Sequence, residues 1–246
     1  MKKTAYIVIC ALLLGTGLGT AQTPQPGKQT EQTLTTNLPV TLDYLLYLPE
    51  KYDTDSTQTW PLILFLHGAG ERGNDLIKVK KHGPPALVET MPILQQFIIL
   101  SPQCPSRDWW NSASLKVLLD DISARYAVDP QRIYVTGLSM GGYGTWDVAA
   151  TYPTYFAAIA PICGGGIPYR VRALAHHNVP AWVFHGLKDT AVDPDESQRL
   201  VDVLRNAGGQ VTYTAYPEAG HDAWTETYRN PALYEWFLAQ QREAYP

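Results

Sequence analysis

Short runs of apolar residues alternate along this chain with segments in which apolar residues recur every three or four positions. The runs predict strands, and the run from Pro61 to Leu66 suits a strand that is covered on both faces. Strands are predicted over residues 41–48, 62–66, 97–100, 132–136, 156–162, 181–184 and 211–216. Helices are predicted over residues 115–126, after 142, over 194–206 and from 230, where Leu233, Trp236 and Phe237 would face the sheet. This alternation predicts an α/β fold with a mostly parallel central sheet and helices on both faces.

The N-terminal segment has a different pattern. Lys2 and Lys3 precede an apolar stretch from Ile7 to Leu14, and small residues lead up to Ala21. This pattern predicts a secretory signal peptide over residues 1–21, whose apolar stretch is too short to span a membrane comfortably. Residues 22–36 are polar, contain two prolines and predict a flexible leader, which leaves residues 37–246 as one domain. We therefore expect a secreted or periplasmic protein with no membrane attachment after cleavage.

Composition narrows the function classes. The net charge is only −4 and no long run of like charges occurs, so nothing favours nucleic acid or an anionic membrane as a partner. No His/Cys cluster has metal-ligand spacing and no phosphate-binding glycine motif follows a strand, so neither a metal nor a cofactor is predicted. Cys104 and Cys163 follow strands that are not expected to be neighbours, which disfavours a disulfide, although the sequence leaves their pairing open.

One glycine-rich turn points to chemistry. Ser139 lies between Gly137 and Gly141, where a predicted strand gives way to a helix. A serine in such a tight strand-to-helix turn is typical of a nucleophile elbow, which exposes the hydroxyl above the sheet. The small neighbours fit, because bulky residues would clash in the turn. The alternative is a glycine-rich turn with an incidental serine.

Two further residues follow in the order that this arrangement requires. Asp189 comes just after the strand predicted over 181–184, and His221 follows the strand predicted over 211–216. His221 could take the proton of Ser139 while Asp189 orients the imidazole. Asp193 is the rival acid, but Asp193-Pro194-Asp195-Glu196 predicts a helix start that is capped by Asp193. We therefore favour Asp189 as the acid.

The loop after the strand over 62–66 is expected to supply part of an oxyanion hole. It reads His67-Gly68-Ala69-Gly70. In a nucleophile-elbow fold, one oxyanion N–H comes from this loop and the other from the residue after the nucleophile. The backbone N–H groups of Ala69 and Met140 are therefore predicted to form the hole. His67 is interpreted as a structural residue that braces the loop, because the base role is already filled.

These motifs carry a family resemblance. They are LHGAGERG at 66–73, SPQCP at 101–105, TGLSMGGYGTW at 136–146, PICGG at 161–165, HGLKD at 185–189 and GHDAW at 220–224. The chain resembles the α/β-hydrolase superfamily. Within it, the chain is similar to secreted feruloyl/acetyl-xylan esterase-like and phospholipase/carboxylesterase-like proteins, whose relatives include predicted peptidases and dienelactone-hydrolase-like proteins. The resemblance implies the α/β-hydrolase fold and assigns nucleophile, acid and base to Ser139, Asp189 and His221. Asp193 stands between Val192 and Pro194, where relatives usually run directly from Val into Pro; this departure bears only on the rival acid.

The chain has no segment long enough for a large lid between the helix after 142 and residue 184. An open groove suits a bulky or polymer-attached ester. Trp110 follows a strand-end loop and Trp224 lies three residues after His221, so both could line an aromatic acyl or sugar pocket. The alternative is that these tryptophans only pack the rim of the domain.

The sequence therefore predicts a secreted serine esterase that cleaves carboxylic esters through an acyl-enzyme. Acetyl or feruloyl esters of plant polysaccharide are the candidate substrates. The first alternative is a serine peptidase, although known peptidases of this fold often carry an extra domain for which this chain has no room. The second is a non-catalytic protein that binds carbohydrate or a partner, which an intact set of three catalytic residues disfavours. The sequence does not choose among acyl groups.

Overall fold

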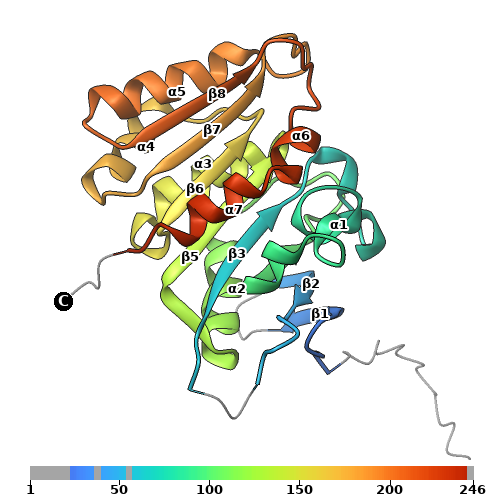
Figure 1. Cartoon of the computed structure of the whole chain (residues 1–246). Helices are drawn as coiled ribbons and strands as arrows, with labels where there is room; N and C mark the ends of the chain where they lie inside the picture. Colours follow the sequence, from blue (N-terminus) through green and yellow to red (C-terminus); the bar gives the residue numbers. More distant parts are fainter. Residues whose placement is uncertain (1–22, 36–39, 54–56, 243–246) are drawn as a thin grey trace, which may run out of the picture.

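The computed structural model describes residues 23–35, 40–53 and 57–242. The predicted signal peptide lies outside these residues. An eight-stranded sheet forms the centre, in the order β1-β2-β4-β3-β5-β6-β7-β8. The strands are β1 (Gln29–Thr35), β2 (Thr41–Tyr47), β3 (Trp60–Leu66), β4 (Ile98–Pro102), β5 (Val128–Leu138), β6 (Ala158–Ile162), β7 (Ala181–Gly186) and β8 (Val211–Tyr216). Figure 1 shows the blue strands β1 and β2 at one end of the sheet and β8 at the other.

The sheet is mostly parallel, as predicted. Strands β4, β3, β5, β6, β7 and β8 pair in parallel, whereas β2 pairs antiparallel with both β1 and β4. Parallel strands need crossover connections, and helices supply them. The α-helices are α1 (Pro84–Leu87), α2 (Ser112–Arg125), α3 (Met140–Thr151), α4 (Pro168–His176), α5 (Pro194–Asn206), α6 (Trp224–Arg229) and α7 (Pro231–Leu238). Short 3₁₀ turns are η1 (Ala69–Glu71), η2 (Leu76–Lys81), η3 (Pro92–Gln96) and η4 (Pro153–Tyr155).

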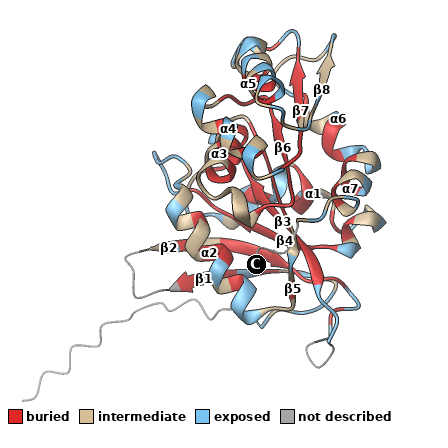
Figure 2. Ribbon diagram, turned by 90° about the vertical axis from the view of Figure 1, so that its left-hand side faces the viewer, coloured by how far each residue is buried: buried red, intermediate tan, exposed pale blue. Residues whose placement is uncertain are grey.

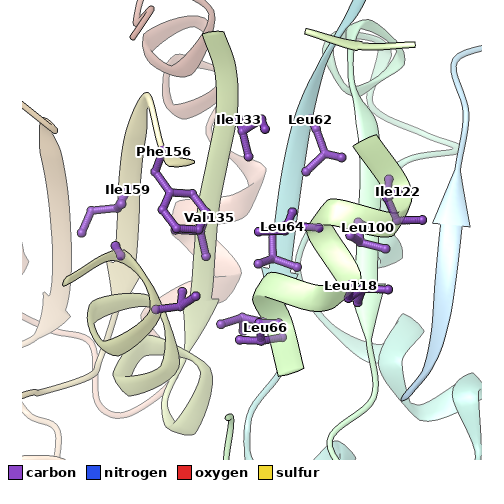
Figure 3. Packing of buried hydrophobic residues seen from close by; sticks show 14 of the residues in the cluster. Leu62, Leu64, Leu66, Leu100, Leu118, Ile122, Ile133, Val135, Phe156 and Ile159 are labelled. Atoms are coloured by element: carbon purple, nitrogen blue, oxygen red, sulfur yellow. The ribbon is translucent and has the colours of Figure 1, made fainter. Parts of the chain in front are cut away.

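Two apolar layers hold these helices against the sheet. On one face, side chains of β3 such as Leu62 and Leu64 belong to the same layer as residues of α2 such as Leu118 (Figure 3). Residues of α3, α4 and α5 join this layer. On the other face, Ile63 and Phe65 join residues of α6 and α7. Successive side chains of a strand point to opposite faces, so β3 contributes to both layers and all its residues are buried. Figure 2 shows the buried strands between helices whose outer surfaces are exposed. Each fully buried leucine stabilises the fold by about 1.5–3 kcal/mol.

The N-terminal strand corrects one prediction. Residues 22–36 were expected to be a flexible leader, but Gln29–Thr35 forms β1 and pairs with β2 from Gln29↔Tyr47 to Thr35↔Thr41. Thr30 and Leu34 are buried while Glu31 is exposed, which is the alternation of an edge strand with one covered face. The pattern was missed because most residues of this strand are polar.

Two other expectations concern the loops and the cysteines. Only α4 lies between β6 and β7, so the described chain carries no large lid there. Cys104 and Cys163 are buried and free, and they follow β4 and β6, which are not adjacent in the sheet.

Among the described residues, no helix has the length and apolar character that crossing a membrane requires.

Candidate active site

Ser139 lies in a strained turn between β5 and α3. Its backbone has φ 53° and ψ −118°, a conformation that non-glycine residues rarely adopt and that costs about 1–3 kcal/mol. The turn is held because the Ser139 N–H donates to the Ile162 carbonyl at 2.9 Å and the Tyr143 N–H donates to the Ser139 carbonyl at 3.1 Å. A Cβ atom on Gly141 would collide with the Leu66 carbonyl oxygen. The predicted strand-to-helix turn is thus present, and the close approach to β3 explains the glycine.

A continuous chain of hydrogen bonds joins the three residues that the motifs singled out. The Ser139 hydroxyl lies 2.9 Å from His221 Nε2, and His221 Nδ1 lies 2.7 Å from Asp189 Oδ2. With a proton on Nδ1, the imidazole donates to the carboxylate and accepts from the hydroxyl. Ser139 and His221 are half-buried, so solvent and a ligand can reach them. This arrangement can move a proton from the hydroxyl to the imidazole while the carboxylate stabilises the imidazolium.

The environment of Asp189 keeps it ionised. Its Oδ1 accepts from the backbone N–H groups of Ala191 at 2.8 Å and Val192 at 2.9 Å. Burial alone would raise the pKa of Asp189, but the hydrogen bonds from His221, Val192 and Ala191 outweigh burial and hold the pKa below its ordinary value. Asp193 instead accepts from the Asp195 N–H at 3.0 Å and caps α5, as predicted. The geometry therefore pairs His221 with Asp189.

A second histidine contacts the same carboxylate. His185, at the end of β7, is fully buried, and its Nε2 lies 3.2 Å from Asp189 Oδ2 and 3.1 Å from the Val192 carbonyl. Its Nδ1 lies 2.7 Å from Ser197 Oγ. Burial lowers the pKa of His185, so the ring is neutral and its Nε2–H faces the carboxylate. No role for His185 was predicted from the sequence, because its contact with Asp189 forms only in the folded loop after β7.

The same cluster is the one group in the described chain that could be considered for a metal. Cys163 Sγ, a ring nitrogen of His185 and a carboxylate oxygen of Asp189 lie within 4.8 Å of one another. Burial raises the pKa of the Cys163 thiol to about 12, whereas a metal is bound by the thiolate. Both carboxylate oxygens of Asp189 already accept hydrogen bonds. The cluster therefore fits a hydrogen-bonded support for Asp189 better than a metal site.

The predicted oxyanion residues lie at neighbouring strand ends. Met140 is the first residue of α3 and Ala69 is the first residue of η1. The first N–H groups of a helix have no partner within that helix, so both are free of intrahelical bonds. Their strands are neighbours, since Leu66 at the end of β3 pairs with Gly137 of β5. Ala69 is exposed, whereas Met140 is buried.

His67 braces this loop, as predicted. It is 1% exposed, its Nδ1–H donates to the Gly68 carbonyl at 2.6 Å, and its Nε2 accepts from the Cys104 N–H at 3.0 Å. Burial lowers its pKa to about 4, so the ring is neutral. Trp110 packs edge-on against this ring at 4.7 Å and donates its indole N–H to the His67 carbonyl at 3.1 Å.

The two tryptophans proposed from the sequence contact different residues of the site. Trp110 braces the loop after β3 through His67. Trp224, the first residue of α6, packs edge-on against His221 with ring centroids 5.0 Å apart. Its ring also meets His82 at 5.7 Å. Both tryptophans therefore contact residues of the site, and each is half-buried.

Comparisons with known proteins agree with this fold. The model of the Dienelactone hydrolase family matches residues 111–240, more than half of the chain. The solved structure described as a thermostable esterase shares 34% identity with a TM-score of 0.80, over 87% of this chain and 63% of that one. The protein named "Probable feruloyl esterase C" of Aspergillus terreus is 25% identical over 72% of this chain and 66% of its own length.

A poly(3-hydroxyalkanoate) depolymerase C of Paucimonas lemoignei is 46% identical over 65 residues, which are 26% of this chain. The chain spans only 15% of the length of that relative. The family match falls on the segment that contains Ser139, Asp189 and His221. The chain therefore belongs to the dienelactone hydrolase family, within the α/β-hydrolase superfamily.

Proposed function

We propose that this protein is a serine esterase that cleaves carboxylic esters through an acyl-enzyme. The observation that carries the proposal is the hydrogen-bond chain from the Ser139 hydroxyl through His221 to Asp189. His221 Nε2 takes the hydroxyl proton as Ser139 Oγ attacks the carbonyl carbon. The tetrahedral intermediate collapses, and His221 gives the proton to the departing alcohol. A water molecule, activated in the same way, then releases the acid and restores Ser139.

The developing oxyanion needs donors that are already in place. We propose that the N–H groups of Ala69 and Met140 supply them, because both begin helical turns at neighbouring strand ends. Removing one such donor typically costs about 10²–10³ in kcat. Neither N–H comes from a side chain, so no single side-chain deletion removes it.

The proposed substrates are acetyl or feruloyl esters of plant polysaccharide, met outside the cytoplasm after export. The open site, the relatives named as esterases and the signal-peptide pattern support this choice. Trp110 and Trp224 are proposed to contact the substrate, since both pack against residues of the site. Aromatic contacts contribute roughly 0.5–1.5 kcal/mol beyond area burial, so losing one should shift kcat/KM several-fold.

The decisive experiment combines a probe with a substrate panel. A fluorophosphonate should label the wild-type protein but not Ser139→Ala, while Ser106→Ala, which removes an exposed serine of the loop after β4, should label normally. Ser139→Ala should lower kcat on p-nitrophenyl acetate by several orders of magnitude. Labelling of the Ser139→Ala variant would reject the nucleophile. Faster cleavage of a peptide anilide than of methyl ferulate, acetyl-xylan or p-nitrophenyl esters would favour the peptidase, and no turnover or labelling would favour a binding protein.

A further inference from the structure

A hollow lies beside the proposed active site, along the side of α3. It has a volume of about 210 Å³ and lies between α3, the start of α4 and the loop that carries Trp109 and Trp110. Tyr143, Gly144 and Asp147 of α3 line the hollow together with Arg170 of α4. Neither Ser139 nor His221 is among the described residues that line the hollow. The hollow, called the α3 pocket below, is therefore separate from the reacting atoms.

The α3 pocket nevertheless shares a wall with the active site. Tyr143 lies one helical turn from Ser139, and its N–H donates to the Ser139 carbonyl. Trp110 faces the pocket and also donates to the His67 carbonyl in the loop before Ala69. A Cβ on Gly144 would lie 2.8 Å from the Trp110 ring, so glycine permits this close packing. A ligand in the pocket would thus be a near neighbour of an ester held at Ser139.

Aromatic side chains line the α3 pocket, and one of them is largely exposed. Trp109 and Tyr143 meet edge-on with ring centroids 6.3 Å apart. Trp109 is 64% exposed, and Ile167, which also lines the pocket, is 48% exposed. Neighbouring large apolar side chains that are exposed to solvent often mark a binding surface.

A fixed pair of charges forms the polar edge of the pocket. Asp147 accepts from Arg170 and from the Ser112 hydroxyl, and Arg170 also donates to the Thr151 hydroxyl. Both charged side chains are partly exposed. The guanidinium has five N–H donors and the carboxylate has several lone pairs, so both retain capacity for a ligand. The pocket therefore offers flat apolar rings on one side and rigid donors and acceptors on the other.

We propose that the α3 pocket binds a sugar ring of the polysaccharide chain that carries the ester, an inference that rests on the proposed esterase function. A pyranose ring has C–H faces that pack on indole and phenol rings. It also has hydroxyl groups at its edge that can donate to Asp147 and accept from Arg170. The exposed ring of Trp109 lets the contact continue outside the hollow, as a polymer requires. An aromatic acyl group, which must stay bonded to the carbonyl at Ser139, would make less use of the charged edge.

Binding is tested without catalysis, in the Ser139→Ala background. Native electrophoresis through gels that contain soluble xylan, β-glucan, mannan or pectin measures retardation by each polymer. At least one polymer should retard the parent, and Trp109→Ala and Tyr143→Ala should each weaken the affinity about twofold to tenfold, because both rings line the pocket. Ile77→Ala is the matched control, because Ile77 is 72% exposed but lies in η2, outside the α3 pocket. Retardation by none of the polymers, or retardation that both variants leave unchanged, would overturn the proposal.

A kinetic arm separates the sugar from the acyl group. In the Ser139-containing protein, Trp109→Ala should lower kcat/KM for a polymer-borne ester several-fold more than for methyl ferulate. An equal or larger loss on methyl ferulate would place the acyl group in the pocket and overturn the inference. Fluorophosphonate labelling of the same samples reports the nucleophile independently. If the Ser139-containing protein is labelled but the Ser139→Ala protein binds no polymer, only the proposal for the α3 pocket is contradicted. If the Ser139-containing protein is not labelled, the esterase proposal is contradicted.

Discussion

Replacing Asp189 by asparagine tests the proton pathway with the smallest possible change in shape. The side-chain amide of the Asp189→Asn variant would have one oxygen and one NH₂ group where the carboxylate has two acceptors. Two backbone N–H groups, from Ala191 and Val192, face the Oδ1 position at 2.8 and 2.9 Å. Placing NH₂ there would lose two hydrogen bonds, worth roughly 2 kcal/mol together, and would oppose donor to donor. The amide oxygen should therefore keep the Oδ1 position and the NH₂ group should face the histidines.

That orientation determines the expected loss. The NH₂ group at the Oδ2 position donates to His221 Nδ1, so the ring proton moves to Nε2 and points at Ser139. An imidazole in this tautomer cannot accept the hydroxyl proton. The expected fall in kcat is about 10⁴, equivalent to about 5.4 kcal/mol of transition-state stabilisation.

The assay is hydrolysis of p-nitrophenyl acetate, with circular dichroism to show that each variant folds. Asp193→Asn is the matched control, because asparagine caps a helix about as well as aspartate and should leave kcat within a few-fold of wild type. A folded Asp189→Asn variant that keeps more than a tenth of the activity would refute this reasoning. So would a larger loss in Asp193→Asn.

Three further outcomes are expected. The pKa of His67 is about 4 in the folded protein and about 6.5 in the unfolded chain, so the free energy of unfolding should fall by about 3 kcal/mol as the pH drops from above 6.5 to 4. Urea unfolding at several pH values measures this fall. The His67→Gln variant should show a smaller dependence of the free energy of unfolding on pH. Gly141→Ala should destabilise the protein by about 3 kcal/mol, because its Cβ meets a backbone carbonyl of β3; an unchanged urea midpoint would contradict the close approach. His185→Phe should lower kcat about tenfold with little change in KM, since it removes a hydrogen bond to Asp189 but no substrate contact; a change in KM alone would argue against a positioning role.

Much of the sheet could be predicted because its central strands are buried on both faces. The predicted bounds of α5 and β8 agree with the structure, since a capped proline start marks α5 and a glycine pair at 208–209 separates it from β8. β1 was missed because Gln29–Thr35 has one apolar residue, and its strand conformation depends on pairing with β2. α4 was also missed, since a nine-residue helix with two buried apolar residues has too weak a periodicity.

Part of the candidate site could also be predicted from the sequence, and part could not. Ser139, Asp189 and His221 could be selected because each follows a predicted strand, and the carboxyl ends of parallel strands meet at one edge of the sheet. The contact between His185 and Asp189 depends on how one loop folds back, which no periodicity encodes. The α3 pocket could not be predicted from the sequence either, because its lining comes from three separate segments whose side chains meet only in the folded protein.

The pairing of Leu66 with Gly137 has a consequence for how this protein can change. The loop with Ala69 and the turn with Ser139 extend from two neighbouring strands that are joined by a backbone ladder, so their spacing does not depend on side chains. Trp109 and Ile167, which line the α3 pocket, follow other strands, β4 and β6. Substitutions at these two positions can therefore accumulate, in nature or in a directed-evolution library, without displacing the serine from the N–H groups beside it. Selectivity and reaction geometry are separately adjustable in this scaffold.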